Sequence, residues 1–119
     1  MTVQIKRAYE PASASDGYRV YIDRLWPQGL SHETFPYDWW DKAISPSPAL
    51  REWFHADPTD RWPEFEKRYA AELKANPAFE QLKEAIAGKD VVTLLYSSHD
   101  QTHNNAVVLR DLLNTSLKA

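Results

Sequence analysis

The chain has 119 residues, a length that fits one folded domain and leaves no room for a second of ordinary size. An apolar fraction of 43% and a charged fraction of 26% are typical of a globular domain and exclude an intrinsically disordered chain. The net charge of −3, with acidic and basic residues interspersed, disfavours generic binding to nucleic-acid backbone. Since the chain has no cysteine, disulfides, thiolate metal sites and thiol nucleophiles are excluded. We therefore expect residues 1–119 to form a single domain.

No segment approaches the roughly 20 apolar residues that a membrane-spanning helix needs, and the N-terminal MTVQIKRAYE lacks the apolar run of a secretory signal. We expect a cytoplasmic protein with no membrane partner. The five Trp, six Tyr and four Phe are many for this length. Large rings can fill a small core, or they can form a surface patch for a homo-oligomer, and periodicity does not separate these alternatives.

Two strands are predicted near the N-terminus. Residues Thr2 to Lys6 alternate between apolar and polar, and Tyr18 to Asp23 is rich in β-forming residues. Between them, Pro11 to Gly17 has the composition of a loop. Pro27 and Gly29 then favour a change of direction directly after the second strand.

Helices are predicted for the middle of the chain, after an ambiguous segment from Leu30 to Ile44. Ser47-Pro48 and Asn76-Pro77 each combine a helix-capping residue with a proline at the first helical position, and Gly88 ends the second of these helices. Between them, Asp60 is predicted to cap a third helix. Its apolar stripe, with spacings of three and four residues, consists of Trp62, Phe65, Tyr69 and Leu73.

The C-terminal part contains the most apolar strand of the sequence. Val91 to Tyr96 is a nearly unbroken apolar run, which is typical of a strand buried on both faces at the centre of a mainly parallel sheet. Ser97 to Thr102 follows as a loop, and a last helix is predicted from about His103 to Leu117. The predicted fold class is α/β: a small, mostly parallel sheet with flanking helices in a Rossmann-like arrangement of three layers or nearly three.

Polar side chains follow two of the predicted strands. Because ligands of open parallel sheets bind outside the carboxyl ends of the strands, these side chains are candidates for one cleft. The residues expected to converge there are Asp23, Arg24, Ser97, His99, Asp100, His103 and Asn104. A carboxylate, an imidazole, a guanidinium and a helix N-terminus together suit acid/base work on a polar substrate.

Each of these residues also has a structural interpretation. As catalytic groups, Asp23 or Asp100 would act as base and His103 as acid or base, while Arg24 and the N-terminus of the last helix would hold an anion. Alternatively, Arg24 braces the fold against a main-chain carbonyl, and Asp100 only caps the last helix with His103 in its first turn.

Cofactor and metal chemistry is not expected. His99 and His103 have the four-residue spacing of helical metal ligands, but the predicted helix begins between them. Ser97 lacks the G-x-S-x-G surroundings of a nucleophile, and the three glycines form no phosphate-binding loop. His55 lies near a helix end and is interpreted as a cap or a surface group.

Three blocks of the sequence carry a family resemblance. RVYIDRLWPQGL (Arg19 to Leu30), ISPSPALREWFHADPTDRWPEFEKRYAAEL (Ile44 to Leu73) and VTLLYSSHDQTHNNAVVLRDLL (Val92 to Leu113) resemble the signature blocks of the YeaO-like branch of domain-of-unknown-function family 488. The resemblance implies a compact, Rossmann-like α/β fold and no established activity. The residues that match the pattern are Asp23, Arg24, Trp26, Pro27, Gly29, Asp100, His103 and Asn104.

The chain departs from the family pattern at three positions. Gln28 and His99 stand where the family commonly has a cation, and Asn105 stands where it usually has a histidine. These changes weaken anion binding as a role shared by the family, or they imply a different ligand for this member.

Two functions from different classes are therefore predicted. The first is an enzyme, a hydrolase or transferase acting on a small polar or phosphorylated substrate through Asp23, Asp100 and His103. The second is a non-catalytic module that binds a nucleotide or metabolite in the same cleft. The residues predicted to contact the small anionic or polar ligand are Arg24, Trp26, Tyr96, Ser97, His99 and Asn104. Nucleic-acid binding is disfavoured because no helix-turn-helix with a basic, exposed recognition helix is visible.

Overall fold

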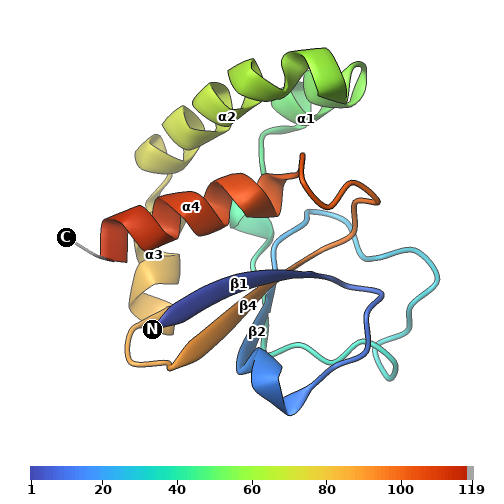
Figure 1. Cartoon of the computed structure of the whole chain (residues 1–119), viewed down its shortest axis with the longest axis vertical. Helices are drawn as coiled ribbons and strands as arrows, with labels where there is room; N and C mark the ends of the chain where they lie inside the picture. Colours follow the sequence, from blue (N-terminus) through green and yellow to red (C-terminus); the bar gives the residue numbers. More distant parts are fainter. Residues whose placement is uncertain (118–119) are drawn as a thin grey trace.

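A computed structural model describes residues 1–117 and shows one four-stranded, all-parallel sheet in the order β1-β4-β2-β3 (Figure 1). The strands are β1 (Thr2–Arg7), β2 (Tyr18–Tyr21), β3 (Trp39–Trp40) and β4 (Val91–Tyr96). The helices are α1 (Pro48–His55), α2 (Pro58–Ala75), α3 (Pro77–Ile86) and α4 (Asn105–Leu117), with 3-10 turns at Ala14–Asp16 and Lys42–Ile44. The predicted α/β class and parallel sheet are confirmed.

The central strand is β4, as its unbroken apolar sequence predicts. It pairs with β1 on one side, where Lys6 lies opposite Leu95, and with β2 on the other, where Val20 lies opposite Leu94. Every residue of β4 after Val91 is buried. A strand flanked on both edges and covered on both faces is mostly apolar, and its one polar residue, Thr93, donates from its hydroxyl to the carbonyl of Asp16.

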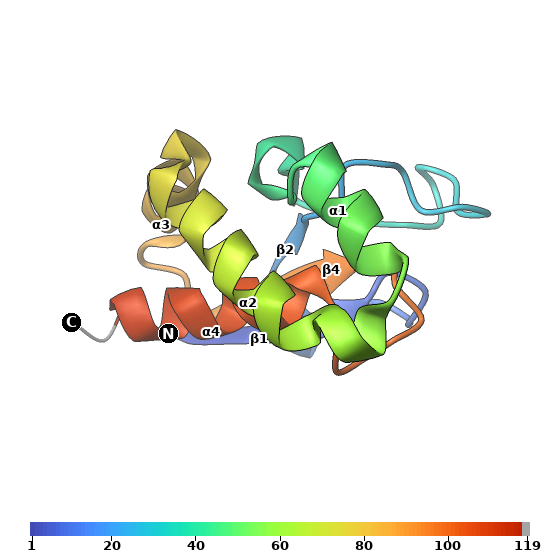
Figure 2. The same ribbon diagram turned by 90° about the horizontal axis from the view of Figure 1, so that it is seen from above.

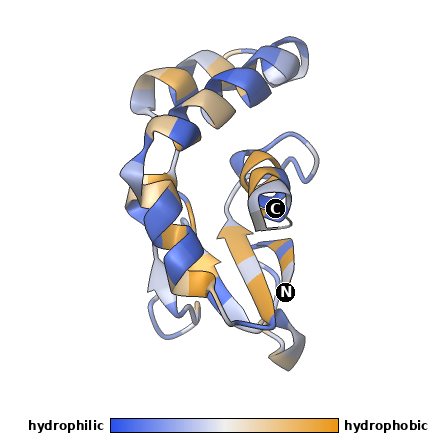
Figure 3. Cartoon of the chain, turned by 90° about the vertical axis from the view of Figure 1, so that its left-hand side faces the viewer, coloured by the Kyte–Doolittle hydropathy of each residue, from blue (hydrophilic) through white to orange (hydrophobic). Residues whose placement is uncertain are grey.

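The helices pack on one face of the sheet, so the predicted three-layer, Rossmann-like arrangement is not found. One hydrophobic cluster joins alternate strand residues such as Val3, Val92 and Leu94 to buried residues of all four helices. In Figure 1 the helices lie on the same side of the strands, and Figure 2 shows α2 crossing over α4. Figure 3 shows hydrophobic residues on the strands and on the helices around them.

Loops rather than helices cover the opposite face of the sheet. Tyr21 and Leu95 point to this face and pack with Phe35, and partly buried apolar side chains from β3 and the segment before it surround them. Those partly buried side chains are Trp26, Leu30, Tyr37 and Trp40. The aromatic residues of the ambiguous segment thus replace a third layer, because large rings bury much apolar area with few residues.

Two of the three predicted helix caps are confirmed and one is wrong. The side chain of Ser47 accepts a hydrogen bond from the N–H of Leu50, and that of Asn76 accepts one from Ala78. The cap of α2 is Asp57, not Asp60, whose N–H donates to the Asp57 carboxylate. Asp57-Pro58 repeats the same cap-then-proline pattern as the other two helices. Among the helices of residues 1–117, none combines the length and hydropathy that crossing a membrane requires.

A buried carboxylate in the core predicts a pH-dependent stability. Asp41 is 4% exposed, and its Oδ2 has no hydrogen-bond partner among residues 1–117. Burial raises its pKa from 3.8 to about 6, although main-chain N–H groups nearby oppose this. Because the folded pKa exceeds the unfolded one, ionisation destabilises the fold as pH rises from about 4 through 6. We expect Asp41→Asn to raise the free energy of unfolding by about 1–2 kcal/mol at pH 7.5 and by much less at pH 4.

Urea denaturation at the two pH values measures this difference. The exposed Asp90→Asn variant serves as a control with the same charge change. An Asp41→Asn gain that is equal at pH 4 and pH 7.5 contradicts the assignment of the effect to the buried charge.

Candidate functional site

Asp23 joins the ends of two strands to the start of the last helix. Its Oδ2 accepts hydrogen bonds from both the N–H and the Oγ of Ser97, at 2.8 and 2.6 Å. Its Oδ1 accepts a third from Nδ2 of Asn105, in the first turn of α4, at 2.9 Å. The segments leaving β2 and β4 therefore open on the same side of the sheet, as the sequence predicts.

The start of α4 differs from the prediction. The helix begins at Asn105, and its cap is Asn104, whose Oδ1 accepts from the N–H of Val107 while its Nδ2 donates to the carbonyl of Asp100. Asp100 instead closes the preceding turn, accepting from the main-chain N–H groups of Thr102 and His103. Hydrogen bonds from these N–H groups lower the pKa of Asp100. The predicted ligand contact Asn104 and the predicted base Asp100 thus both form hydrogen bonds within the chain itself.

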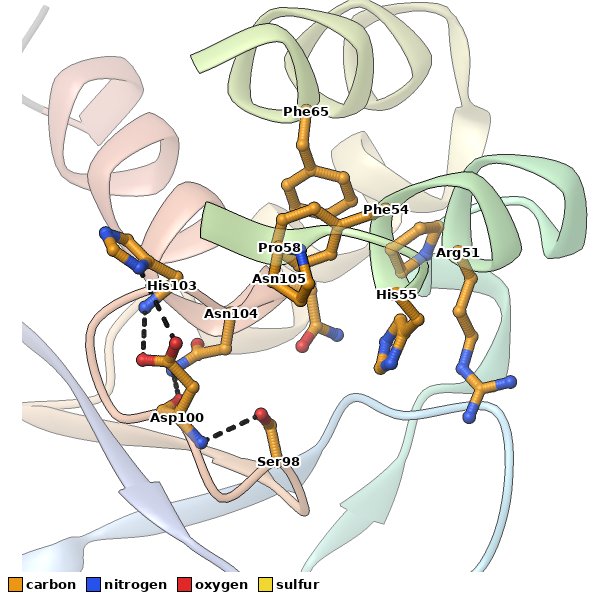
Figure 4. Close-up of a pocket in the computed structure, with 11 residues that line it drawn as sticks. Arg51, Phe54, His55, Pro58, Phe65, Ser98, Asp100, His103, Asn104 and Asn105 are labelled. Atoms are coloured by element: carbon orange, nitrogen blue, oxygen red, sulfur yellow. Dashed lines mark hydrogen bonds and ion pairs between the residues drawn. The ribbon is translucent and has the colours of Figure 1, made fainter. Parts of the chain in front are cut away.

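A cavity of about 110 Å³ lies between α1, the start of α2 and the turn before α4. Figure 4 shows Arg51 and His55 on one side of it, His103 and Asp100 on the other, and the rings of Phe54 and Phe65 above. The complete lining is Pro46, Arg51, Phe54, His55, Pro58, Phe65, Ser98, Asp100, His103, Asn104 and Asn105. We refer to it as the larger cavity.

A smaller cavity of about 80 Å³ adjoins the first at the ends of β2 and β4. Its lining is Asp23, Arg24, Leu25, Arg51, His55, Ser97, Ser98 and Asn105. The two cavities share four residues, namely Arg51, His55, Ser98 and Asn105. Because the same side chains line both, the cavities form one cleft with an apolar and a polar end.

Two arginines border the cleft, and they differ in their partners. Arg24 is exposed and its Nη2 donates to the carbonyl of Pro46 at 3.4 Å, which agrees with the bracing role considered from the sequence. The Arg51 guanidinium forms no hydrogen bond or ion pair with any of residues 1–117. Arg51 therefore presents all its donors to the cleft and the solvent.

The two histidines of the cleft have different surroundings. Burial is the main cause that lowers the pKa of His55, and repulsion from the Arg51 guanidinium lowers it further. The negative charge of Asp23 only partly opposes this. The ring of His103 packs against that of Trp62 with centroids 4.9 Å apart, and its Nδ1 lies 3.5 Å from Oδ2 of Asp100. His103 lines the larger cavity and Asp23 the smaller one, so the two predicted catalytic groups border the same cleft without lining a common cavity.

Three of the predicted ligand contacts lie outside the cleft. Trp26 belongs to the aromatic group on the opposite face of the sheet, where its Nε1 donates to the carbonyl of Leu30. Tyr96 is 2% exposed in the core, and burial raises the pKa of its hydroxyl. His99 is exposed and contacts Nη2 of Arg7 at 3.3 Å.

Arg51, Ser98 and Asn105 are cleft residues that the sequence did not single out, and His55 was interpreted as a cap or surface group. Arg51 and His55 occupy positions four apart on α1, so they lie on one face of that helix. That spacing was visible in the sequence, but which helix face meets the cleft depends on the tertiary packing of α1 against the β4–α4 turn. Within residues 1–117, no three potential His, Asp or Glu ligands cluster as a metal ion would require.

The fold and cleft define a class: a small, all-parallel α/β domain whose candidate site lies at the carboxyl ends of its strands. The chain belongs to the YeaO-like DUF488 family, since residues 2–119 match a family described as the inactive DUF488-N3 subclade. It is 44% identical to the uncharacterized protein YeaO of Escherichia coli over 115 residues, 97% of this chain and 99% of the relative. It is also 38% identical to the uncharacterized protein Rv3073c of Mycobacterium tuberculosis over 112 residues, 94% of this chain and 93% of the relative. The search of solved structures gave no significant match.

The hydrogen bonds to Asp23 predict that replacing this residue strongly lowers the stability of the fold. Asp23→Ala leaves the three donors of Ser97 and Asn105 without their carboxylate acceptor, so we expect the free energy of unfolding to fall by about 2–4 kcal/mol. Chemical denaturation measures this loss. Asp111→Ala, which removes an exposed carboxylate that pairs with its neighbour Arg110, should change stability by less than about 0.5 kcal/mol. Equal effects of the two variants would argue against a joining role for Asp23.

Proposed function

We propose that this domain is a non-catalytic module that binds a small anionic ligand, a phosphate or carboxylate compound, in the cleft beside α1. The observation that carries the proposal is the Arg51 guanidinium, which lines both cavities and has no partner within residues 1–117. An arginine that lines a concave site with all its donors available matches the planar, two-pronged geometry of an oxyanion.

The candidate bases of the cleft are engaged in structural hydrogen bonds. Asp23 accepts hydrogen bonds on both carboxylate oxygens, and Oδ1 of Asp100 accepts from two main-chain N–H groups, so both carboxylates already stabilise the turns around the cleft. This supports the binding alternative over the hydrolase or transferase alternative.

Asn105 gives a second reason to favour binding. In the family pattern that the sequence resembles, this position usually carries a histidine, and here its amide donates to Asp23. An amide side chain does not act as a general acid or base near neutral pH, whereas an imidazole paired with a carboxylate can. The description of the matched subclade as inactive agrees with this difference.

The other groups of the cleft complement an anion. Arg24 adds a second positive charge at the smaller cavity, and the hydroxyl of Ser98 lines both cavities beside Arg51. The carboxylate at the smaller cavity, that of Asp23, accepts hydrogen bonds from Ser97 and Asn105. We propose that an oxyanion takes the place between Arg51 and Arg24, with Ser98 as a neutral donor.

Replacement of Arg51 tests this assignment. We expect Arg51→Gln to weaken the binding of sulfate, used as an oxyanion of constant charge, by about 10-fold, because a charge-assisted hydrogen bond contributes about 1.5–3 kcal/mol. Isothermal titration calorimetry at low ionic strength measures the affinity. Arg110→Gln removes an equal charge from α4, outside both cavities, and should leave the affinity within about 2-fold. A loss of affinity that is the same in both variants refutes a specific site at Arg51.

The lowered pKa of His55 predicts a pH dependence of binding. His55 is neutral near pH 7.5 and gains a proton only below its lowered pKa, which adds a positive charge to the cleft. Sulfate should therefore bind roughly 3-fold to 5-fold more tightly at pH 5 than at pH 7.5. His55→Gln should abolish this increase, while His103→Gln, across the larger cavity, should retain it. Retention of the full increase in His55→Gln would rule out His55 as its source.

A further inference from the structure

We propose that the ligand of this cleft is a carboxylate that carries one small ring, with the ring in the larger cavity and the acid group in the smaller one. This inference rests on the proposed function and deepens it, because it names the part of the ligand that the oxyanion contacts leave undefined. It comes from the contrast between the two ends of the cleft.

The larger cavity has an apolar wall, which would contribute nothing to the binding of an inorganic ion. Phe54 and Phe65 stack with ring centroids 4.1 Å apart and an interplanar angle of 20°, and both are at most 5% exposed. Pro46 and Pro58 extend this wall. Apolar surface in a concave site stabilises a bound group by its removal from water, which favours an apolar part in the ligand.

The smaller cavity supplies the charged end. Of its lining residues, Arg24 and Arg51 carry positive charge, and the negative charge of Asp23 is bound to donors of the chain. Arg51 also lines the larger cavity and stands on the same side of it as His55 in Figure 4. A group that leaves the apolar wall toward the smaller cavity must therefore pass Arg51, which fixes the order of ring and acid along the cleft.

The size of the larger cavity limits the ring. An apolar cavity of about 150 Å³ is known to take benzene. With about 110 Å³ and an opening toward the smaller cavity, the larger cavity suits one five- or six-membered ring better than a fused pair.

Binding of matched carboxylates tests the proposal. At pH 7.5, benzoate should bind about 10-fold or more tightly than acetate, because its ring is buried, and 2-naphthoate should bind more weakly than benzoate. Benzyl alcohol, with the ring but without the acid, should bind at least 10-fold more weakly than benzoate. Titrations followed by NMR give these affinities, and intermolecular nuclear Overhauser effects should connect the benzoate ring to Phe54 and Phe65. Arg51→Gln should weaken benzoate, and Arg110→Gln should not.

The outcomes separate this inference from the proposed function. If acetate and benzoate bind with equal affinity and both lose it in Arg51→Gln, the oxyanion site stands and the ring proposal is overturned. If benzoate binds but its affinity is the same in Arg51→Gln, or its ring contacts lie away from Phe54 and Phe65, the ring proposal is also overturned. If none of sulfate, acetate and benzoate binds, both proposals fail.

Discussion

The carboxylate of Asp23 is the interaction on which the cleft depends. It lies just beyond β2 and accepts hydrogen bonds from the residue that follows β4 and from the first residue of α4. Without it, two parallel strands and a helix would end near one another with their polar groups unpaired. Because one carboxylate accepts from three donors, the chain segments that follow β2 and β4 keep fixed positions relative to each other. Ser98 and Asn105 are thereby held facing α1. The same engagement removes Asp23 from acid/base chemistry, so the residue that builds the site is not the one that acts in it.

The one-sided packing of the helices decides what faces that cleft. With α1, α2, α3 and α4 on the same face of the sheet, the carboxyl end of α1 meets the turn before α4, and both cavities lie along this junction. The aromatic rings around Trp26 cover the other face. Because no helix of residues 1–117 packs there, large Trp and Tyr side chains are needed to bury it. The cleft thus combines apolar rings from the edge of the core with a surface arginine, Arg51, that has no partner in the described part of the chain. That combination is the reason for proposing an organic acid, rather than a simple inorganic ion, as the ligand.

Local signals in the sequence predicted most of the elements, because they depend on neighbouring residues. The cap-then-proline pairs at Ser47 and Asn76 started helices as expected, and the apolar run from Val91 to Tyr96 formed the central strand. The sequence carries the same pattern at Asp57-Pro58, and Asp57, not the predicted Asp60, caps α2. Trp26 illustrates what local signals miss: it lies close to the strand end in sequence, but after the bend at Arg24 and Leu25 its ring packs on the opposite face of the sheet. For Asn104 and Asp100, several capping residues in succession left the helix start ambiguous until the packing of α4 was known.

The account requires that an oxyanion binds at Arg51 and not merely to a positively charged surface. Its most direct test is an NMR titration with sulfate that follows the Nε–H signals of the arginine side chains together with the main-chain N–H of Asn105. The account predicts that the signals of Arg51 and Asn105 shift together and saturate at one common affinity, while that of Arg110 stays unchanged. Small, unsaturated shifts of equal size at all arginines would contradict it.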